Sequence, residues 1–311
     1  MKTNRTEVIS ALLGNEFSPE FVDAHCHLDK LDNPRAYVQE AGVAGYAFFA
    51  MTCEPSAFEP LQNTLVNCEN VTVGLGLHPW YVGEGTDEGA GISSCEAYAT
   101  QAGAHVGESP ATQAGVHVGE SFATQAGERV GESFATQAGE HVCETSGKYT
   151  LEEQLAQFES LLDKTQLVGE VGLDFSPKHN KTREAQIEAF TRIASLCANR
   201  TGKILSLHAV DASTEVLDIL EETGCLDACT CIFHWFSGSS EDLIRARDAG
   251  CLFSMGRQML ASRRGSSYIL AVDWDHILIE TDYYPEGDAQ VFEHVHQMQV
   301  SVELSKRMKH A

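Results

Sequence analysis

Short apolar runs alternate along this chain with longer segments of helical character, and this alternation is the feature that most limits the folds open to it. Runs rich in Val, Ile, Leu and Phe are typical of strands buried on both faces. They lie at about residues 20–24, 43–50, 71–76, 166–171, 203–207, 229–234, 250–254 and 276–281. Strands that alternate with helices predict a parallel sheet, and eight such units predict closure into a barrel. We therefore expect an α/β fold, the (β/α)8 TIM barrel, in this chain of 311 residues.

Side chains that can ligate metals come at the ends of five of these runs. In chain order they are His25, His27, Glu170, His208, His234 and Asp282. The C-terminal ends of the strands form the face on which such barrels carry their chemistry. A lone histidine at a strand end is most often a core group, but six candidates in order favour a metal centre. Four imidazoles and two carboxylates on one rim suit one or two divalent cations.

The spacing of these residues indicates how they divide between two ions. Side chains two apart in a strand point to the same side, so His25 and His27 can hold one ion together. Glu170 is suited to bridge two ions. His208 and His234 follow neighbouring strands and can complete a second site.

Asp282 follows the last run, which lies beside the first run if the barrel closes. It can ligate the first ion and also accept a proton from water. Two ions so placed stabilise both the attacking and the leaving oxygen of a phosphoryl displacement. Oxygen donors suit Mg²⁺ or Mn²⁺, whereas four histidines suit Zn²⁺ equally well.

Residues 83–150 interrupt the third connection with an internal repeat of period twelve, whose copies begin ATQAG at positions 99, 111, 123 and 135. Each copy has too few apolar side chains to form a buried core, so a flexible surface arm is expected. A metal-binding or partner-binding arm is the alternative, because His105, His117 and His141 recur at one position of the repeat. We expect one barrel domain over 1–311, with 83–150 as a low-complexity insertion after the third strand.

A helix is expected directly after the insertion. Thr150 and Glu153 form the pattern of a capping box. The apolar stripe that follows consists of Leu151, Leu155, Phe158, Leu161 and Leu162. This helix would cover the third strand as the barrel requires.

The net charge of −24 argues against loose binding to duplex DNA, which needs a basic face. An anionic substrate would have to be held locally, by metal and a few cations. No apolar run reaches the ~18 residues of a membrane helix, and the N-terminus lacks the pattern of a signal peptide, so a cytoplasmic location is expected. The ten cysteines are expected to be structural. Cys225, Cys229 and Cys231 lie near His234 but contain no CxxC pair that would indicate zinc.

Six motifs together resemble the TatD family of metal-dependent deoxyribonucleases, within the amidohydrolase-like barrels. They are DAHCHLD (23–29), GLGLHPW (74–80), VGEVGLDF (168–175), SLHA (206–209), HWFSG (234–238) and ILIETD (277–282). The resemblance runs from residue 20 to residue 282 apart from the insertion. It implies a phosphodiesterase with two divalent metal ions that trims DNA, often from the 3′ end of single strands.

The resemblance also implies a role for each matching residue. His25, His27 and Asp282 would bind the first metal, His208 and His234 the second, and Glu170 both. His78, in the HPW turn, would contact the scissile phosphate. Asp282 would also orient or deprotonate the water, so the catalytic residues are expected to be Asp282, Glu170 and His78.

The chain departs from the family at the surface that would face DNA. Val210 stands where the family commonly has an arginine that contacts phosphate. Three arginines near the seventh strand could replace it: Arg257, Arg263 and Arg264. After Asp282 the chain continues with Tyr283 and Tyr284, which could stack on a base or pack the rim. The chain then ends at Ala311, earlier than the family usually does.

Two alternatives remain open. Related barrels hydrolyse cyclic amides, phosphotriesters or esters, so a small-molecule or aminoacyl-ester substrate is possible. Glu170 stands where many such barrels use a carboxylated lysine, which favours the nuclease, whereas Val210 and the acidic charge favour a small substrate. A binding or scaffold protein on a retained barrel is the third possibility, and stoichiometric metal after purification would argue against it.

Overall fold

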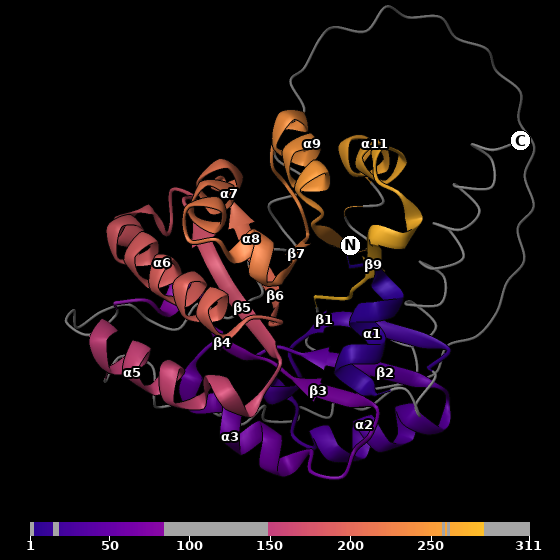
Figure 1. The fold of residues 1–311 in the computed structure, drawn as a ribbon. Coiled ribbons are helices and arrows are strands. Elements are labelled where there is room, and N and C mark those ends of the chain that lie inside the picture. The colour runs from indigo at the N-terminus through magenta and orange to yellow at the C-terminus, as the bar shows by residue number, and fades with distance from the viewer. Residues whose placement is uncertain (1–2, 15–18, 84–148, 257–258, 260–261, 283–311) are drawn as a thin grey trace, which may run out of the picture. The chain divides into compact units, whose positions relative to one another are not determined.

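The structure of the protein is a computed structural model, which describes residues 3–14, 19–83, 149–256, 259 and 262–282. Helices and strands alternate through these ranges (Figure 1). The strands are β1 (Phe21–Cys26), β2 (Tyr46–Ala50), β3 (Val71–Val73), β4 (Leu75–Leu77), β5 (Leu167–Asp174), β6 (Ile204–Val210), β7 (Thr230–His234), β8 (Leu252–Met255) and β9 (Ile277–Ile279). The α-helices are α1 (Arg5–Leu13), α2 (Pro34–Val43), α3 (Pro55–Thr64), α5 (Leu151–Leu161), α6 (Arg183–Arg200), α7 (Ser213–Glu222), α8 (Cys225–Ala228), α9 (Ser240–Ala249) and α11 (Arg263–Ala271).

All strand pairs are parallel, which confirms the predicted α/β fold with parallel sheets. The strands follow chain order in two sheets, β1-β2-β3 and β4-β5-β6-β7-β8-β9. Only Gly74 separates β3 from β4, so the predicted strand at 71–76 is divided in two. A Cβ atom at Gly74 would lie 3.0 Å from both the carbonyl oxygen of Gly169 and the sulfur of Met51. The chain therefore passes from one sheet to the other at a position where a side chain would be tightly packed.

The ends of β9 and β1 are joined by hydrogen bonds. The backbone N–H of Asp282 donates to the carbonyl of His25 at 2.9 Å. The buried carboxylate of Asp23 accepts from the N–H of Thr281 at 3.0 Å and from its hydroxyl at 2.6 Å. The last described strand thus lies beside the first.

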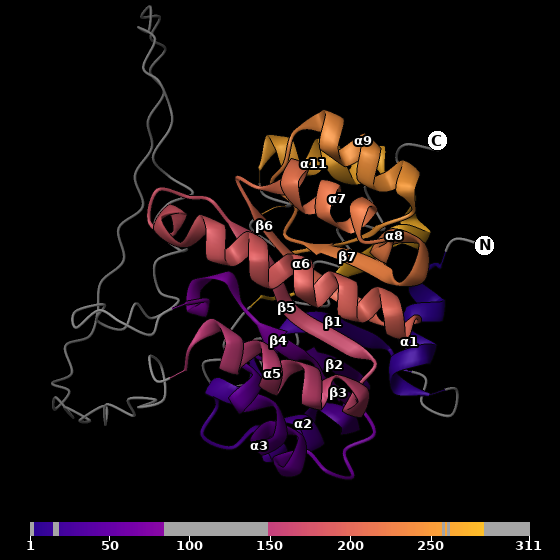
Figure 2. The same cartoon turned by 60° about the vertical axis from the view of Figure 1, so that its left-hand side comes forward.

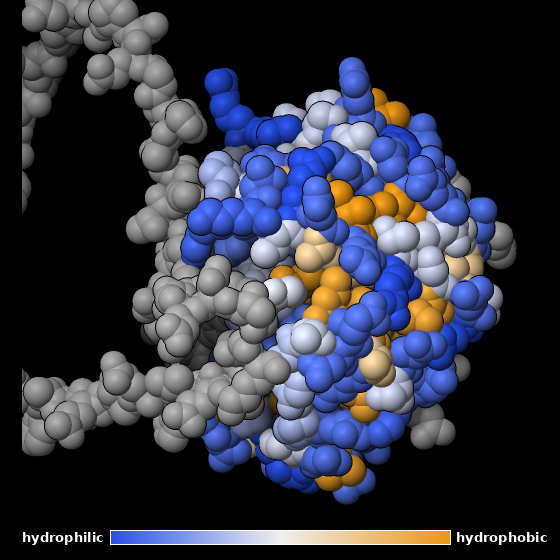
Figure 3. Space-filling model, turned by 90° about the vertical axis from the view of Figure 1, so that its left-hand side faces the viewer, coloured by the Kyte–Doolittle hydropathy of each residue, from blue (hydrophilic) through white to orange (hydrophobic). Residues whose placement is uncertain are grey.

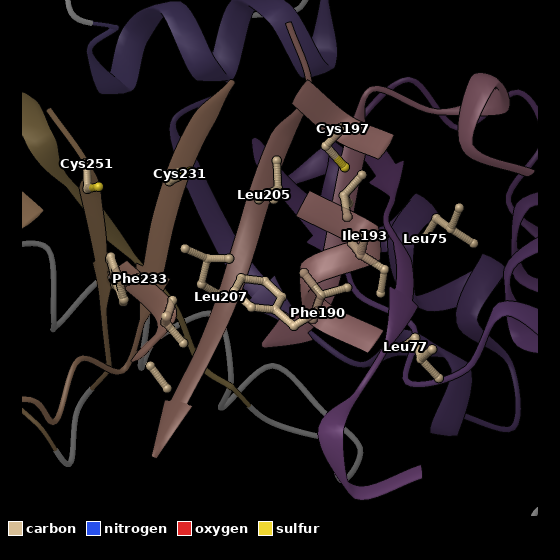
Figure 4. Close-up of a cluster of buried hydrophobic side chains, with 14 of the residues drawn as sticks. Leu75, Leu77, Phe190, Ile193, Cys197, Leu205, Leu207, Cys231, Phe233 and Cys251 are labelled. Atoms are coloured by element: carbon tan, nitrogen blue, oxygen red, sulfur yellow. The ribbon is translucent and has the colours of Figure 1, made fainter. Parts of the chain in front are cut away.

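The buried hydrophobic residues form two clusters. The smaller cluster draws one or two side chains from each of seven strands and is covered by Val8 of α1; its strand members are Val22, Ala24, Ala47, Phe49, Leu167, Ile204, Ile232, Leu252 and Leu278. The larger cluster lies between strands and helices. In Figure 4, Phe190 and Ile193 of α6 point toward Leu205 and Leu207 of β6. Helices α5, α6 and α7 lie on one side of β4, β5 and β6 (Figure 2).

Several predicted strand limits differ from the structure, three of them by three residues. Val43 was expected to begin a strand, but it ends α2 and is 92% exposed. Strands β5 and β6 run three residues beyond the predicted ends, because Gly172 pairs with His208 and Asp174 with Val210. Gly172 has φ 142° and a Cβ atom there would lie 2.0 Å from the carbonyl oxygen of His208, so glycine permits the continuation.

The predicted capping box of α5 is confirmed: the hydroxyl of Thr150 accepts from the N–H of Glu153, whose carboxylate accepts from the N–H of Thr150. Leu155, Phe158 and Leu161 are buried on its inner face. The repeat copies at 99–146 lie outside the described residues, as does nearly all of the predicted insertion at 83–150. The prediction that residues 1–311 form one barrel domain, with residues 83–150 as an insertion, therefore stays a prediction.

The face shown in Figure 3 is mostly hydrophilic, with hydrophobic side chains scattered between charged ones. Among the described helices, none is long and apolar enough to cross a membrane. Eight of the cysteines fall within the described residues and all eight are free thiols. No group of three or more potential metal ligands found among the described residues includes a cysteine.

Candidate metal centre

A bulge in β5 positions the side chain at the middle of the site. Val168 pairs with Leu205 of β6, but the next pair is Val171 with Leu207, so β5 contains one extra residue between these pairs. Glu170 lies in this bulge. Bulges redirect a side chain and are frequent beside active sites. The expectation that Glu170 ends its strand is therefore wrong, because β5 continues to Asp174.

The two carboxylate oxygens of Glu170 face two different groups of imidazoles. Oε2 lies 3.3 Å from Nε2 of both His25 and His27. Oε1 lies 2.6 Å from Nδ1 of His208 and 2.9 Å from Nε2 of His234. All five side chains are buried. A carboxylate placed in this way can share its oxygens between two cations.

Asp282 lies on the side of the first histidine pair. Its Oδ1 is 3.7 Å from Nε2 of His25 and 3.8 Å from Nε2 of His27. Its backbone has φ 49°, in the left-handed region that a non-glycine residue enters at a cost of ~1–3 kcal/mol. The hydrogen bond to the His25 carbonyl fixes this conformation. Asp282 is thus held at the rim, three residues beyond the end of β9.

His78 directly follows β4 and approaches the same carboxylate. Its Nδ1 accepts from the N–H of Trp80 at 3.1 Å, which caps the short helix η2 (Pro79–Tyr81). Its Nε2 lies 3.2 Å from Oε1 of Glu170. Because Nδ1 accepts, the proton of the neutral ring sits on Nε2, which is then a donor. His78, Glu170 and His208 are close enough to hold an ion, but this tautomer suits His78 to an anionic oxygen instead.

The structure brings all seven predicted site residues together. Each of the five histidines lies within 3.3 Å of a Glu170 oxygen, and Asp282 closes the first group. These residues lie in β1, β5, β6 and β7, directly after β1 and β4, and, for Asp282, three positions after β9.

A further set of polar groups holds the histidines from behind, and the sequence did not single it out. The hydroxyl of Ser206 lies 2.8 Å from Nδ1 of His25. Asp174 Oδ2 lies 3.2 Å from Nε2 of His208. Glu280 Oε2 faces Nδ1 of His234 at 3.7 Å, beyond hydrogen-bond distance, and the other oxygen of Glu280 accepts from the N–H of Trp235 at 2.9 Å. Carboxylate and hydroxyl partners of this kind fix the orientation of imidazole ligands. All three lie inside motifs that the sequence offers, SLHA, GLDF and IETD, but only the tertiary structure brings each one to its histidine.

Burial and close charges shift the pKa values of the site. Burial raises the pKa of Glu170, but His78, His234 and His25 oppose this and hold it well below its usual range. Burial lowers the pKa of His25 and of His78 to about 4. Near neutral pH, Glu170 is therefore a carboxylate, and these two imidazoles are uncharged. A neutral imidazole is the form that ligates metals.

The pKa of Asp282, the second carboxylate among the predicted ligands, is shifted upward. Burial, together with Glu170 and Glu280, raises the pKa of Asp282 to about 6 against the opposing effect of His234. Burial lowers the pKa of His234, but the charges of Glu170 and Asp282 outweigh burial and raise this pKa well above its usual range. Such opposed shifts in a compact cluster are typical of functional sites.

The donor atoms fit divalent cations. The Nε2 atom of His25 is buried and has no hydrogen-bond partner. Nitrogen and oxygen ligands at about 2.0–2.2 Å from one tetrahedral ion lie about 3.3 Å apart. The distances from Glu170 Oε2 to His25 and His27 are both 3.3 Å. The site therefore has both the spacing and the unsatisfied lone pair that a cation requires.

Two of the three arginines expected to replace the missing one, Arg263 and Arg264, fall within the described residues. Arg264 donates to the carbonyl of Gly238 and to the hydroxyl of Tyr268, which commits it to local structure. Arg263 is exposed at the start of α11. Arg257, Tyr283 and Tyr284 lie outside the described residues.

Comparison with known proteins assigns the family. The sequence model of the TatD related DNase family matches residues 22–307. This chain belongs to that family. A relative within it, human Deoxyribonuclease TATDN3, is 28% identical over 135 residues, which make up 42% of this chain and 48% of the human one. The match thus spans about half the length of the curated relative.

One solved structure supports the fold. A hydrolase TatD family protein from Entamoeba histolytica superposes with a TM-score of 0.55 at 15% identity, over 86% of this chain and 74% of that one. A TatD-like protein from Archaeoglobus fulgidus gives a TM-score of 0.47 at 13% identity, over 92% of this chain and 95% of that one. At such identities, the first comparison supports a common fold and no more.

Proposed function

We propose that this chain is a metal-dependent hydrolase that cleaves phosphodiester bonds in DNA. The observation that carries the proposal is the position of Glu170, whose two oxygens face two separate pairs of histidines. Family membership supports the same reaction, and the human relative is named a deoxyribonuclease.

We propose two divalent cations, Mg²⁺, Mn²⁺ or Zn²⁺, held on either side of Glu170. His25, His27 and Asp282 would hold the first ion, and His208 and His234 the second. The distances among these donor atoms and the unpartnered Nε2 of His25 support this assignment. When bound, the ions supply Lewis-acid stabilisation of the phosphate oxygens and lower the pKa of water.

The side chains around the ions divide the remaining work. Asp282, with a pKa raised to about 6, is ionised near neutral pH and can accept a proton from the attacking water. His78 offers the Nε2 proton to an oxygen of the scissile phosphate, because its Nδ1 is engaged by Trp80. Glu170 keeps its negative charge and fixes the spacing between the two halves of the site.

Single-stranded DNA, or a 3′ end, is the substrate that the charge of the chain supports. A net charge of −24 disfavours a duplex laid across a broad surface. A strand end that enters one rim needs only local contacts.

We also propose that the strands close into the (β/α)8 barrel. The hydrogen bonds between β9 and β1 support closure, as does the cluster that draws side chains from seven strands. With β1 and β9 already side by side, closure would put His25 and Asp282 on one continuous rim.

Val210 supports a second candidate, a small ester or amide substrate. It occupies the end of β6 where a guanidinium would bind phosphate in the family, so one contact to a DNA backbone is absent. A compact substrate held mainly by the ions would not need that contact.

Cleavage of a 3′-labelled single-stranded oligonucleotide by metal-stripped protein, with Mg²⁺, Mn²⁺ or Zn²⁺ restored, tests the proposal. Glu170→Gln and His25→Ala should abolish cleavage, whereas Glu188→Gln on the exposed face of α6 and His276→Ala before β9 should not. Bound metal is counted in the same samples by mass spectrometry. If two ions are bound but DNA is not cleaved, the proposed metal site stands and DNA is excluded as the substrate. If no metal is bound, both the metal site and the nuclease function are excluded.

A further inference from the structure

A stack of two aromatic rings lies directly beside the metal centre. The rings of Trp80 and His179 are parallel to within 9°, with centroids 4.5 Å apart. Trp80 follows β4 by three positions, and His179 lies in the loop after β5, so the two come together only through the packing of neighbouring strands. Both side chains are only partly buried. Neither ring has a role in the proposed hydrolysis, in which only the backbone N–H of Trp80 takes part.

The stack is fixed to the site by a single carboxylate. The indole Nε1 of Trp80 donates to Asp174 Oδ2 at 2.6 Å, and the same oxygen lies 3.2 Å from Nε2 of His208. The Trp80 ring is 4.8 Å from the ring of His78 and 6.1 Å from that of His208. The stack therefore adjoins the centre that would bind the scissile phosphate.

The loop that carries His179 is locally basic in an acidic protein. Residues 176–183 read SPKHNKTR and contain three cations and no acid, in a chain of net charge −24. Lys178 is exposed, and its Nζ lies 5.6 Å from the centroid of the Trp80 ring. Lys181 is also exposed, whereas Arg183 pairs with Glu215. The long-range field repels a polyanion, so a cation at the rim is where a phosphate can be held.

We propose that Trp80, His179 and Lys178 form a nucleotide subsite, in which one base of a single strand extends the Trp80–His179 stack and the adjacent phosphate pairs with Lys178. Aromatic stacking beside cations is how single strands are bound without regard to sequence. The inference rests on the proposed nuclease function and adds to it a requirement for an unpaired base beside the cleaved bond. It also gives the chain a local phosphate contact where Val210 provides none.

The test combines protein variants with oligonucleotides that lack one base. A set of single-stranded substrates, each with an abasic site at a different position around the cleaved bond, is assayed with wild-type protein. One position should raise KM by about 5- to 150-fold, the equivalent of the ~1–3 kcal/mol that one stacked base contributes. His179→Ala and Trp80→Leu should raise KM for the intact strand and abolish the difference between intact and abasic substrates. Trp80→Phe, which keeps a ring, should retain part of that difference.

Lys178→Ala should weaken binding of intact and abasic strands alike and reduce its dependence on salt. His276→Ala and Arg5→Ala are matched controls. His276 is a half-buried imidazole just before β9, at the end away from Asp282. Arg5 lies over the ring of Trp274 as Lys178 lies over the ring of Trp80. Both controls should leave KM and the abasic difference unchanged.

Binding of the same strands in Ca²⁺, followed by fluorescence anisotropy, provides a readout without turnover. Equal losses with every abasic position, or an abasic difference that survives in His179→Ala and Trp80→Leu, would overturn the subsite while cleavage by wild-type protein leaves the nuclease intact. Wild-type protein that cleaves no strand would instead overturn the proposed function, and the subsite with it.

Discussion

Asp174 Oδ2 accepts a hydrogen bond from the indole of Trp80 at 2.6 Å. The same oxygen lies 3.2 Å from the ring of His208, so one buried carboxylate joins the aromatic stack to the metal centre. Burial raises the pKa of this carboxyl, but His208, Ser176 and Trp80 outweigh burial and hold it below its usual range. Asp174 is therefore a carboxylate near neutral pH, as Glu170 is.

Asp174→Asn should lower metal affinity by ~10–100-fold, the usual effect of removing a carboxylate that orients a histidine ligand. The amide keeps the shape of the side chain but loses the charge that fixes His208. Titration calorimetry of metal-stripped protein measures the change. Asp163→Asn, whose side chain is 75% exposed in a pair with Arg200, is the control. Unchanged affinity would mean that Asp174 serves Trp80 alone.

Ser206→Ala should weaken the first metal site and destabilise the metal-free protein. The hydroxyl is the hydrogen-bond partner of Nδ1 of His25, and its loss would leave a fully buried imidazole nitrogen unsatisfied, at a cost of ~1–3 kcal/mol. Urea unfolding in a chelator gives the free energy. Ser195→Ala removes a hydroxyl that only returns to the carbonyl of Thr191 within α6, and should cost less. Equal costs would argue against a specific role for Ser206.

Gly76→Ala should prevent the site from assembling. A Cβ atom there would lie 1.6 Å from the carbonyl oxygen of Thr52 and 2.7 Å from the backbone nitrogen of Glu170. A backbone clash of this size should cost more than ~4 kcal/mol, at the extreme for a single substitution. Gly256→Ala is the matched control, because its Cβ atom would meet nothing closer than 3.6 Å. Soluble expression and chemical unfolding compare the two, and equal stability would refute the close approach.

Stability should fall above about pH 9 because of buried thiols. Burial raises the pKa of Cys197 from 9.0 to about 12, so the folded protein keeps a proton that the unfolded chain releases between these values. The free energy of unfolding therefore decreases with pH: the stability present below pH 9 is lost as the pH rises toward 12, by ~1.4 kcal/mol per pH unit for this thiol. Urea unfolding of Cys197→Ala between pH 8 and 10.5 should show a shallower decline than wild type. Cys68→Ala, which removes a half-buried thiol, should not, and equal slopes in all three proteins would contradict the prediction.

Periodicity and strand order sufficed to predict the parallel α/β fold and the gathering of the six metal-ligand candidates, whereas His78 was assigned only from the family resemblance. His25 and His27 needed only the two-residue period of a strand. The bulge at Glu170 was not predictable, because it arises from pairing with β6, more than thirty residues away. The extension of β5 past Gly172 depends equally on the backbone of β6.

The groups that support the site were missed for a related reason. Asp174 and Ser206 are unremarkable within their own strands, and their roles appear only when β5 and β6 lie side by side. The Trp80–His179 stack likewise joins two loops that the sequence separates by the whole 83–150 segment. Local patterns reveal which residues can do chemistry, but not which ones hold them in place.

The hydrogen bonds from Thr281 to Asp23 span 258 positions along the chain. His25 and His27 are synthesised early, whereas Asp282 reaches them only after β9 has docked beside β1. A nascent chain still on the ribosome therefore carries its imidazoles without the carboxylate that would activate water. Under the proposed mechanism, the first metal site would therefore stay incomplete during synthesis until residue 282 has been translated and β9 has docked beside β1.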